Sequence, residues 1–307
     1  MPNLAFIFPG QGAQYTGMGK ELSLHFDQAA AIFHQADEIS SYSISKLCFD
    51  NPEGKLNQTE FAQPALLINS LAACEVALLH GLKPSMVSGL SLGEYSALVT
   101  AGSLTLEEAL PLIQTRARYM QNAVPIGRGA MAAVLGPDIE AVEATCEEDE
   151  GIVSIANYNC PGQVVISGEG SAVERVGKIL KSKGYRVIPL AVSVPSHSML
   201  MFDAAMAFKG DLGKIQWKES NTPVISNVNA CENASAQLVD ILSSQLYKPV
   251  RWEDSVRYMM QHVDYFIEIG PGSTLSGLIK KIDKSRILGN IEDMRSLEKT
   301  LKKVNEL

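Results

Sequence analysis

Ser91, in the run Gly89-Leu90-Ser91-Leu92-Gly93, is the residue best placed to act as a nucleophile. A short apolar segment, Pro84 to Ser88, precedes this G-x-S-x-G run, and a helix-forming segment, Glu94 to Thr100, follows it. The serine therefore lies on a predicted strand-to-helix turn, where glycines relieve strain and crowding. The Leu92 amide is then the natural first donor to an oxyanion. An ordinary glycine-rich turn is the alternative.

A serine needs a base to take its proton, and His197 is the histidine in the most suitable position. It follows an apolar run through Pro195-Ser196 and precedes a helical segment from Met199 to Phe208. This order places it on a strand-to-helix loop, where open α/β sheets build their sites. A structural histidine is the competing interpretation. The remaining histidines lie within or at the ends of predicted helices and need no catalytic role; they are His25, His34, His80 and His262.

Gln11 lies in a tight glycine-flanked loop directly after the first apolar run. The loop has Tyr15 where a dinucleotide fingerprint needs its third glycine, and no Gly-Lys-Ser/Thr follows it. The pattern therefore favours a donor to an oxyanion over a phosphate cradle, with a plain turn as the alternative.

Arg116 indicates what kind of substrate is bound. The sequence predicts a helix that begins at a Thr105–Glu108 capping box, and Arg116 falls in the middle of its apolar stripe. A guanidinium on a buried face is costly unless a carboxylate or phosphate meets it. The alternatives are an internal Glu or Asp partner, or a side chain that reaches past the apolar surface to water.

An α/β fold is expected to position these residues, because short apolar runs alternate with longer segments of helical period. Strands are predicted at residues 4–8, 86–88, 224–227 and 265–269. Residues 130–190 instead follow the order βαββαβ, which is typical of a ferredoxin-like unit. We therefore predict an α/β-hydrolase-like large domain with a parallel sheet, residues 1–127 and 195–307. A ferredoxin-like small domain, residues 128–194, is inserted into it, and the site lies in the cleft between them.

Composition excludes several classes of protein. The 307 residues carry a formal charge of −8 without a long basic run, which argues against a nucleic-acid partner. Five scattered cysteines without a C-x-x-C pair exclude a disulfide framework and a zinc site. We see no signal peptide and no uninterrupted apolar segment of about 20 residues, and so expect a cytoplasmic protein without a membrane partner. We expect a monomer.

Five motifs in one order resemble the malonyl-CoA:acyl-carrier-protein transacylases of bacterial type II fatty acid synthesis. They are Gly10-Gln11-Gly12-x-Gln14, Gly89-x-Ser91-Leu92-Gly93-Glu94, Arg116-x-x-x-Met120, Val194-Pro195-Ser196-His197-Ser198 and Gly270-Pro271-Gly272. The resemblance runs from end to end. It implies ping-pong transfer of malonyl from malonyl-CoA to the phosphopantetheine thiol of an acyl carrier protein, without a metal or redox cofactor.

The resemblance also implies a role for each catalytic residue. Ser91 would attack the thioester, His197 would be the base, and the main-chain carbonyl of Gln245 would orient the imidazole. The backbone N–H groups of Gln11 and Leu92 would form the oxyanion hole.

Arg116 would bind the malonyl carboxylate. Further substrate-binding positions implied by the resemblance are Gln63, Met120, Asn157 and Asn159. The chain departs from the family at Leu90, where histidine is common, and at Ala117, where glycine is usual.

Three alternatives stay open. A serine hydrolase on the same core would use the same turn, but it needs an acidic residue between serine and histidine in the chain and a histidine near the end. A trans-acting acyltransferase of a polyketide pathway would differ only in its carrier protein. A non-catalytic scaffold would carry an inert Ser91.

Overall fold

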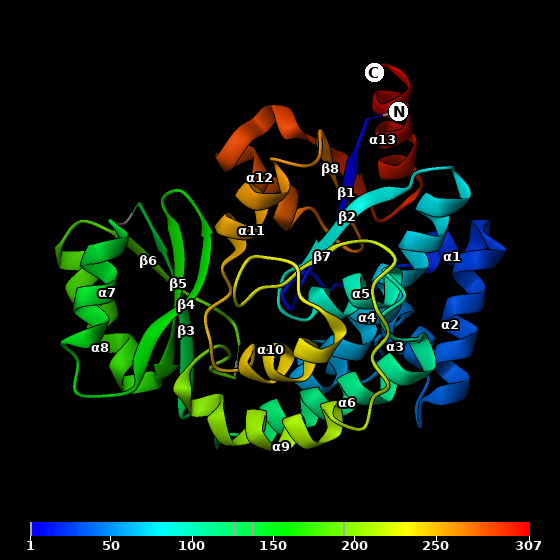
Figure 1. Cartoon of the computed structure of the whole chain (residues 1–307). Helices are drawn as coiled ribbons and strands as arrows, with labels where there is room; N and C mark the ends of the chain where they lie inside the picture. Colours follow the sequence, from blue (N-terminus) through cyan, green and yellow to red (C-terminus); the bar gives the residue numbers. More distant parts are fainter. Residues whose placement is uncertain (1, 126, 137, 193) are drawn as a thin grey trace.

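The computed structural model describes residues 2–125, 127–136, 138–192 and 194–307 and contains two separate sheets (Figure 1). The larger sheet is parallel, with strand order β7-β2-β1-β8-β9. Its strands are β1 Leu4–Phe8, β2 Pro84–Gly89, β7 Val224–Ile225, β8 Tyr265–Ile269 and β9 Ile287–Ile291. The smaller sheet is antiparallel, with order β4-β5-β3-β6. It consists of β3 Gly129–Leu135, β4 Val153–Cys160, β5 Gln163–Glu169 and β6 Arg186–Pro189.

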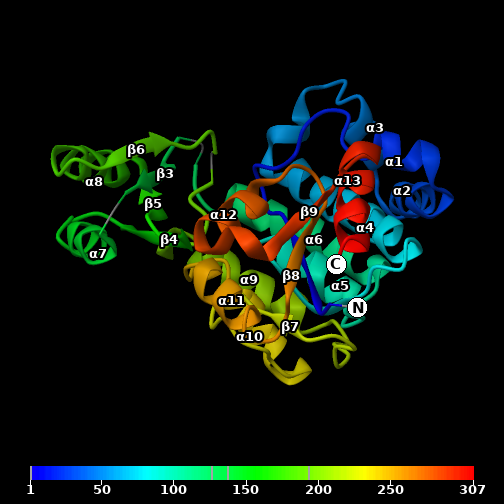
Figure 2. The same ribbon diagram turned by 90° about the horizontal axis from the view of Figure 1, so that it is seen from above.

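Helices cover both faces of the larger sheet and one face of the smaller sheet, and the two termini lie near each other (Figures 1 and 2). The α-helices are α1 Lys20–His25, α2 Asp27–Ile39, α3 Ile44–Phe49, α4 Thr59–Leu79, α5 Gly93–Thr100, α6 Leu106–Asn122, α7 Ile139–Glu147, α8 Gly170–Ser182, α9 Phe202–Leu212, α10 Leu238–Ser244, α11 Trp252–Met259, α12 Thr274–Asp283 and α13 Met294–Asn305. Short 3₁₀ helices occur at Lys55–Asn57, Met199–Met201, Ser235–Gln237 and Lys284–Arg286.

Strand β1 shows how the core of the larger sheet is built. Successive side chains of a strand point to opposite faces. Leu4, Phe6 and Phe8 join the cluster that contains the buried residues of α4, α5 and α6. Ala5 and Ile7 join the cluster formed by α11 and α12. The sheet is therefore covered on both faces, as a parallel sheet requires.

Helix α4 bears on the expectation that no segment spans a membrane. Its 21 residues are long and apolar enough to do so by length and composition. Most of the helix is buried inside the protein, where it packs against α2 and α6. Its apolar composition is thus that of a core helix. A helix that is buried on several sides is apolar all round, as a membrane-spanning helix is.

The smaller sheet has the predicted ferredoxin-like order, with α7 and α8 packed on one face. The opposite face carries Met131, Ala133, Ala156 and Val165. Strand β4 joins the larger part through Val250, which donates to Ala156 O and accepts from Tyr158 N. The domain boundaries at 127/128 and 194/195 stay a prediction, and Ile126 in the predicted boundary segment lies outside the described residues.

The predicted strands at 4–8 and 265–269 coincide with β1 and β8, whereas the predicted strand at 224–227 ends at Ile225. Ser226 and Asn227 leave the sheet because Asn227 turns toward the Ser91 loop, where it makes side-chain hydrogen bonds. Strand β9 was not among the strands proposed from the sequence.

Candidate active site

Ser91 lies on a sharp turn between β2 and α5, as predicted. Its φ angle is 54°, in the left-handed region that side chains rarely adopt. A Cβ atom on Gly89 would lie 2.0 Å from the Gly93 carbonyl carbon, and one on Gly93 would lie 2.1 Å from Phe8 O. Both glycines are therefore required by close backbone approach, and they allow the serine to project from the end of the sheet.

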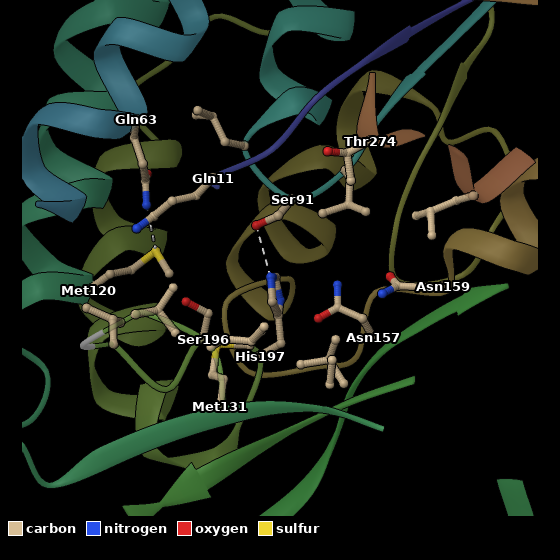
Figure 3. Close-up of a pocket in the computed structure, with 18 of the residues that line it drawn as sticks. Gln11, Gln63, Ser91, Met120, Met131, Asn157, Asn159, Ser196, His197 and Thr274 are labelled. Atoms are coloured by element: carbon tan, nitrogen blue, oxygen red, sulfur yellow. Dashed lines mark hydrogen bonds between the residues drawn. The ribbon is translucent and has the colours of Figure 1, made fainter. Parts of the chain in front are cut away.

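His197 lies against Ser91 and is almost fully buried, with 3% of its surface exposed. Its Nε2 is 2.9 Å from Ser91 Oγ (Figure 3). Its Nδ1 is 2.7 Å from the Gln245 carbonyl oxygen. A carbonyl oxygen can only accept, so Nδ1 carries the hydrogen and Nε2 is left to accept from the serine hydroxyl. Burial, followed by the charge of Arg116, lowers the pKa of His197 to about 4. The imidazole is therefore neutral at neutral pH.

Arg116 lies on α6, whose capping box between Thr105 and Glu108 is present as predicted. Its side chain is fully buried. Nη1 donates to Gln63 Oε1 at 2.7 Å, and Nη2 donates to Gln245 Oε1 at 2.9 Å and to Ser91 Oγ at 3.3 Å.

The acceptors of Arg116 are all neutral oxygens. No carboxylate of the described residues lies within ion-pair distance of the guanidinium, and its Nε has no partner among them. The guanidinium carbon lies 5.4 Å from the ring centre of Tyr95, and burial lowers the pKa of Arg116. A buried cation without a direct anionic partner is suited to bind an anion.

Two backbone amides beside Ser91 have no acceptor within the described part of the chain. They belong to Gln11 and Leu92. The Gln11 side chain is held by the Thr59 hydroxyl, to which its Nε2 donates at 3.1 Å. Both amides belong to residues that line the same cavity as Ser91. They are therefore available to an oxygen atom that develops charge there.

A cavity of about 240 Å³ brings the predicted residues together (Figure 3). The lining residues that the sequence had singled out are Gln11, Gln63, Ser91, Leu92, Arg116, Met120, Asn157, Asn159 and His197. Gln245 contacts the site from behind through its carbonyl and its side chain. Leu90, the departure from the family pattern, also lines the cavity.

The amides Asn157 and Asn159 reach the cavity from β4. Both are buried, and Asn159 Oδ1 has no partner among the described residues. Gln63 Nε2 donates to Met120 Sδ at 3.4 Å, which ties α4 to α6 at the cavity wall (Figure 3). The cavity thus has polar groups from both sheets, and the two amides of β4 are placed to meet polar atoms of a ligand.

Sequence reasoning missed the apolar wall of the cavity and the residues under the Ser91 turn. The wall includes Met131, Ala133, Val165 and Leu278. Alternation along the strands predicts that Met131 and Ala133 share a face, but not what that face meets. Within the described residues there is no group of three or more His, Cys, Asp or Glu side chains that could hold a metal ion.

Comparisons with known proteins agree with this geometry. Residues 5–304 match the acyl transferase domain family. A malonyl CoA-acyl carrier protein transacylase of Bacillus subtilis is 43% identical, with 100% of this chain and 99% of the relative covered. The crystal structure of a malonyl CoA-acyl carrier protein transacylase from Clostridium perfringens has a TM-score of 0.96 at 42% identity, covering 99% of this chain and 98% of that one.

A third similar protein is a malonyl-transacylase in complex with the acyl-carrier protein of a type II polyketide synthase. It has a TM-score of 0.94 at 41% identity and covers 98% of this chain and 99% of its own. Identity at this level over the full length, together with the Ser91–His197 pair and the buried Arg116, leaves one assignment. The chain belongs to the malonyl CoA-acyl carrier protein transacylase family of acyl transferases.

Proposed function

We propose that this protein transfers the malonyl group of malonyl-CoA to the phosphopantetheine thiol of an acyl carrier protein for fatty acid elongation. The observation that carries the proposal is the shared cavity: a serine bonded to a neutral histidine lies beside a buried guanidinium that has no carboxylate partner among the described residues. A malonyl thioester has a carbonyl group that the serine can attack and a free carboxylate that the guanidinium can bind. The names of the relatives support the same substrates.

In the first half-reaction His197 Nε2 takes the proton of Ser91 Oγ, which attacks the thioester carbonyl. The Gln11 and Leu92 amides hold the oxyanion. When the intermediate collapses, the C–S bond breaks, and His197 returns the proton to the departing coenzyme A sulfur. The Gln245 carbonyl keeps the imidazole in the required tautomer throughout.

The second half-reaction repeats these steps with the carrier thiol. His197 takes the thiol proton, the sulfur attacks the malonyl ester, and Ser91 leaves with the proton. No electron and no net proton is exchanged, so we propose that the reaction needs no metal or redox cofactor. The apolar wall around Met131 and Val165 excludes water, which would otherwise hydrolyse the ester.

We propose that the protein acts in the cytoplasm. All of its cysteines are free thiols, and they are Cys48, Cys74, Cys146, Cys160 and Cys231. Free thiols in this number are typical of a reducing compartment.

Intact-mass measurement tests the proposed function. Incubation with malonyl-CoA is expected to add one malonyl group to the protein, and addition of holo acyl carrier protein is expected to remove it and produce malonyl-carrier. Steady release of free malonate without a carrier would instead identify a hydrolase, and absence of any adduct would identify a scaffold. A polyketide-synthase carrier is the second candidate acceptor, because a structural relative forms a complex with one. The relative rates with the two carriers decide between them.

Arg116→Ala is expected to lower kcat/KM for malonyl-CoA by about 10- to 100-fold. A hydrogen bond to a charged group contributes about 1.5–3 kcal/mol, and each 1.4 kcal/mol or so is tenfold in rate. Acetyl transfer is expected to be preserved or improved, since acetyl has no carboxylate. Arg116→Lys is expected to restore only part, because an ammonium cannot present the planar fork. The measurement is kcat/KM with both thioesters.

The matched control for Arg116 is Arg118→Ala on the same helix, where the side chain is exposed. This change is expected to leave both activities unaltered. An equal loss of malonyl and acetyl transfer in Arg116→Ala, or a large fall in its melting temperature, would show that Arg116 serves the fold and not substrate selection.

A further inference from the structure

Asn227 lies just beyond β7 and bonds to the Ser91 turn on both sides of Leu90. Its Oδ1 accepts from the Ser91 amide at 2.6 Å, and its Nδ2 donates to the Gly89 carbonyl at 2.7 Å. The side chain is fully buried and does not line the cavity. One amide therefore links the end of β7 to two peptide groups of the turn, without a position from which to touch a substrate.

The Gln245 side chain bonds to the next peptide group of the turn. Its Nε2 donates to Ser91 O at 3.0 Å and to Glu94 Oε2 at 2.6 Å. Its Oε1 accepts from Arg116. Glu94 thus fixes which end of the Gln245 amide faces the guanidinium, because a carboxylate oxygen must receive the N–H end.

Glu94 joins the two amides. Its Oε2 also accepts from the Asn227 backbone amide at 3.1 Å. The carboxyl group is fully buried, and its Oε1 has no partner among the described residues. Burial raises the pKa of Glu94 to about 7. Burying a carboxyl group costs free energy unless its hydrogen bonds compensate. A buried polar network whose hydrogen bonds are made keeps its members in a fixed arrangement, which we take to be the role of Glu94.

These hydrogen bonds surround the backbone of Ser91, whose conformation is unusual. A residue with a side chain at a φ of 54° is strained and keeps this conformation only when its surroundings over-determine it. Rotation to a negative φ would swing Cβ and Oγ away from His197 Nε2, now 2.9 Å from the oxygen. Misplacement by about 1 Å can lower a rate by about 10²-fold.

We propose that Asn227 and Glu94 are positioning residues that hold the strained Ser91 turn and thereby direct Oγ at His197. Asn227 holds the amide of Ser91 and the carbonyl of Gly89. Glu94 holds Asn227 and, through Gln245, the carbonyl of Ser91. The proposal rests on the proposed function in that Ser91 is the nucleophile, but it does not depend on the identity of the acyl group.

A small sulfonyl fluoride tests this directly, because it reacts with a serine activated by histidine and uses neither Arg116 nor the carrier protein. The rate of Ser91 sulfonylation, followed by intact mass, is expected to fall about tenfold in Asn227→Ala, within the range that misplacement of a reacting atom produces. The isosteric change Glu94→Gln is expected to slow the reaction by a smaller factor. With malonyl-CoA, kcat is expected to fall in both variants while KM stays unchanged, since the cavity wall is intact.

Two buried residues outside the turn provide matched controls. Asn69→Ala removes another buried amide, on α4. Glu268→Gln neutralises another fully buried glutamate, whose oxygens accept from the Leu275 and Ser276 amides at the start of α12. Both changes are expected to lower the melting temperature and to leave the sulfonylation rate unaltered.

Wild-type sulfonylation rates in both Asn227→Ala and Glu94→Gln would overturn the proposal. So would a loss of rate that only matches the fraction of unfolded protein, or an equal loss of rate in the two control variants. Should Asn227→Ala fail to fold, Glu94→Gln decides the question. A wild-type protein that reacts with the sulfonyl fluoride but not with malonyl-CoA would refute the proposed function alone. A wild-type Ser91 inert to both would refute the positioning proposal.

Discussion

Ser91→Ala is expected to abolish the malonyl-enzyme and with it the transfer of malonyl to the carrier protein. The change removes the one oxygen that lies 2.9 Å from His197 Nε2 and 3.3 Å from Arg116 Nη2. Without it no covalent intermediate can form, and a ping-pong reaction has no other route. Intact mass after incubation with malonyl-CoA, together with the rate of malonyl-carrier formation, measures both effects.

Ser96→Ala is the matched control for Ser91, because Ser96 is a buried serine of α5 whose hydroxyl has no partner among the described residues. It is expected to keep both the adduct and the transfer. A malonyl adduct that persists in Ser91→Ala would place the nucleophile elsewhere.

His197→Ala is expected to slow acylation of Ser91 by about 10²–10⁴-fold, the usual contribution of a positioned general base. The physical reason is the chain of contacts from Gln245 O through the imidazole to Ser91 Oγ. Single-turnover acylation measured by rapid-quench mass spectrometry gives the rate. His262→Ala, at an exposed position after α11, is expected to be nearly silent. If His262→Ala lost the acylation activity and His197→Ala kept it, the general base would be His262 and not His197.

The pH profile tests the same histidine. Burial, then the positive charge of Arg116, lowers the pKa of His197 to about 4, from an ordinary value of 6.5. Only the neutral imidazole can accept a proton. In Glu94→Gln, which lacks the buried carboxyl group whose pKa lies at about 7, kcat/KM in the free enzyme is therefore expected to be retained as the pH falls through 6.5 and to be lost toward pH 4. An acid limb centred at or above 6.5 would mean that the imidazole is hydrated or paired with an anion.

The contacts of His197 also distinguish the family from a serine hydrolase. A hydrolase triad places a carboxylate on the imidazole nitrogen that faces away from the serine. Here Nδ1 meets the carbonyl of Gln245, and the neighbouring carboxyl group, Glu94, meets the side chain of Gln245 and not the imidazole. A neutral acceptor orients the ring without adding charge to a site that must bind a malonyl carboxylate.

The sequence by itself determined the features that local geometry dictates. The glycines around Ser91 are needed by the turn in which they lie. The capping box of Thr105 and Glu108 begins α6, and the helical period of α6 puts Arg116 on its buried face. These features depend on backbone dihedral angles and on side-chain periodicity over a few residues, so a short segment contains the information they need.

Only the tertiary structure decided how the residues around Ser91 meet. Asn227 binds Ser91 across 136 positions of sequence, and the Gln245 carbonyl binds His197 across 48. The family resemblance implied the Gln245 contact, but neither loop has a local physical signature of its role. The pairing of β7 with β2 brings Asn227, which the sequence did not single out, under the turn. Side-chain type and spacing indicate that a residue can donate or accept, but the partner is set by which strands pair and how the loops between them pack.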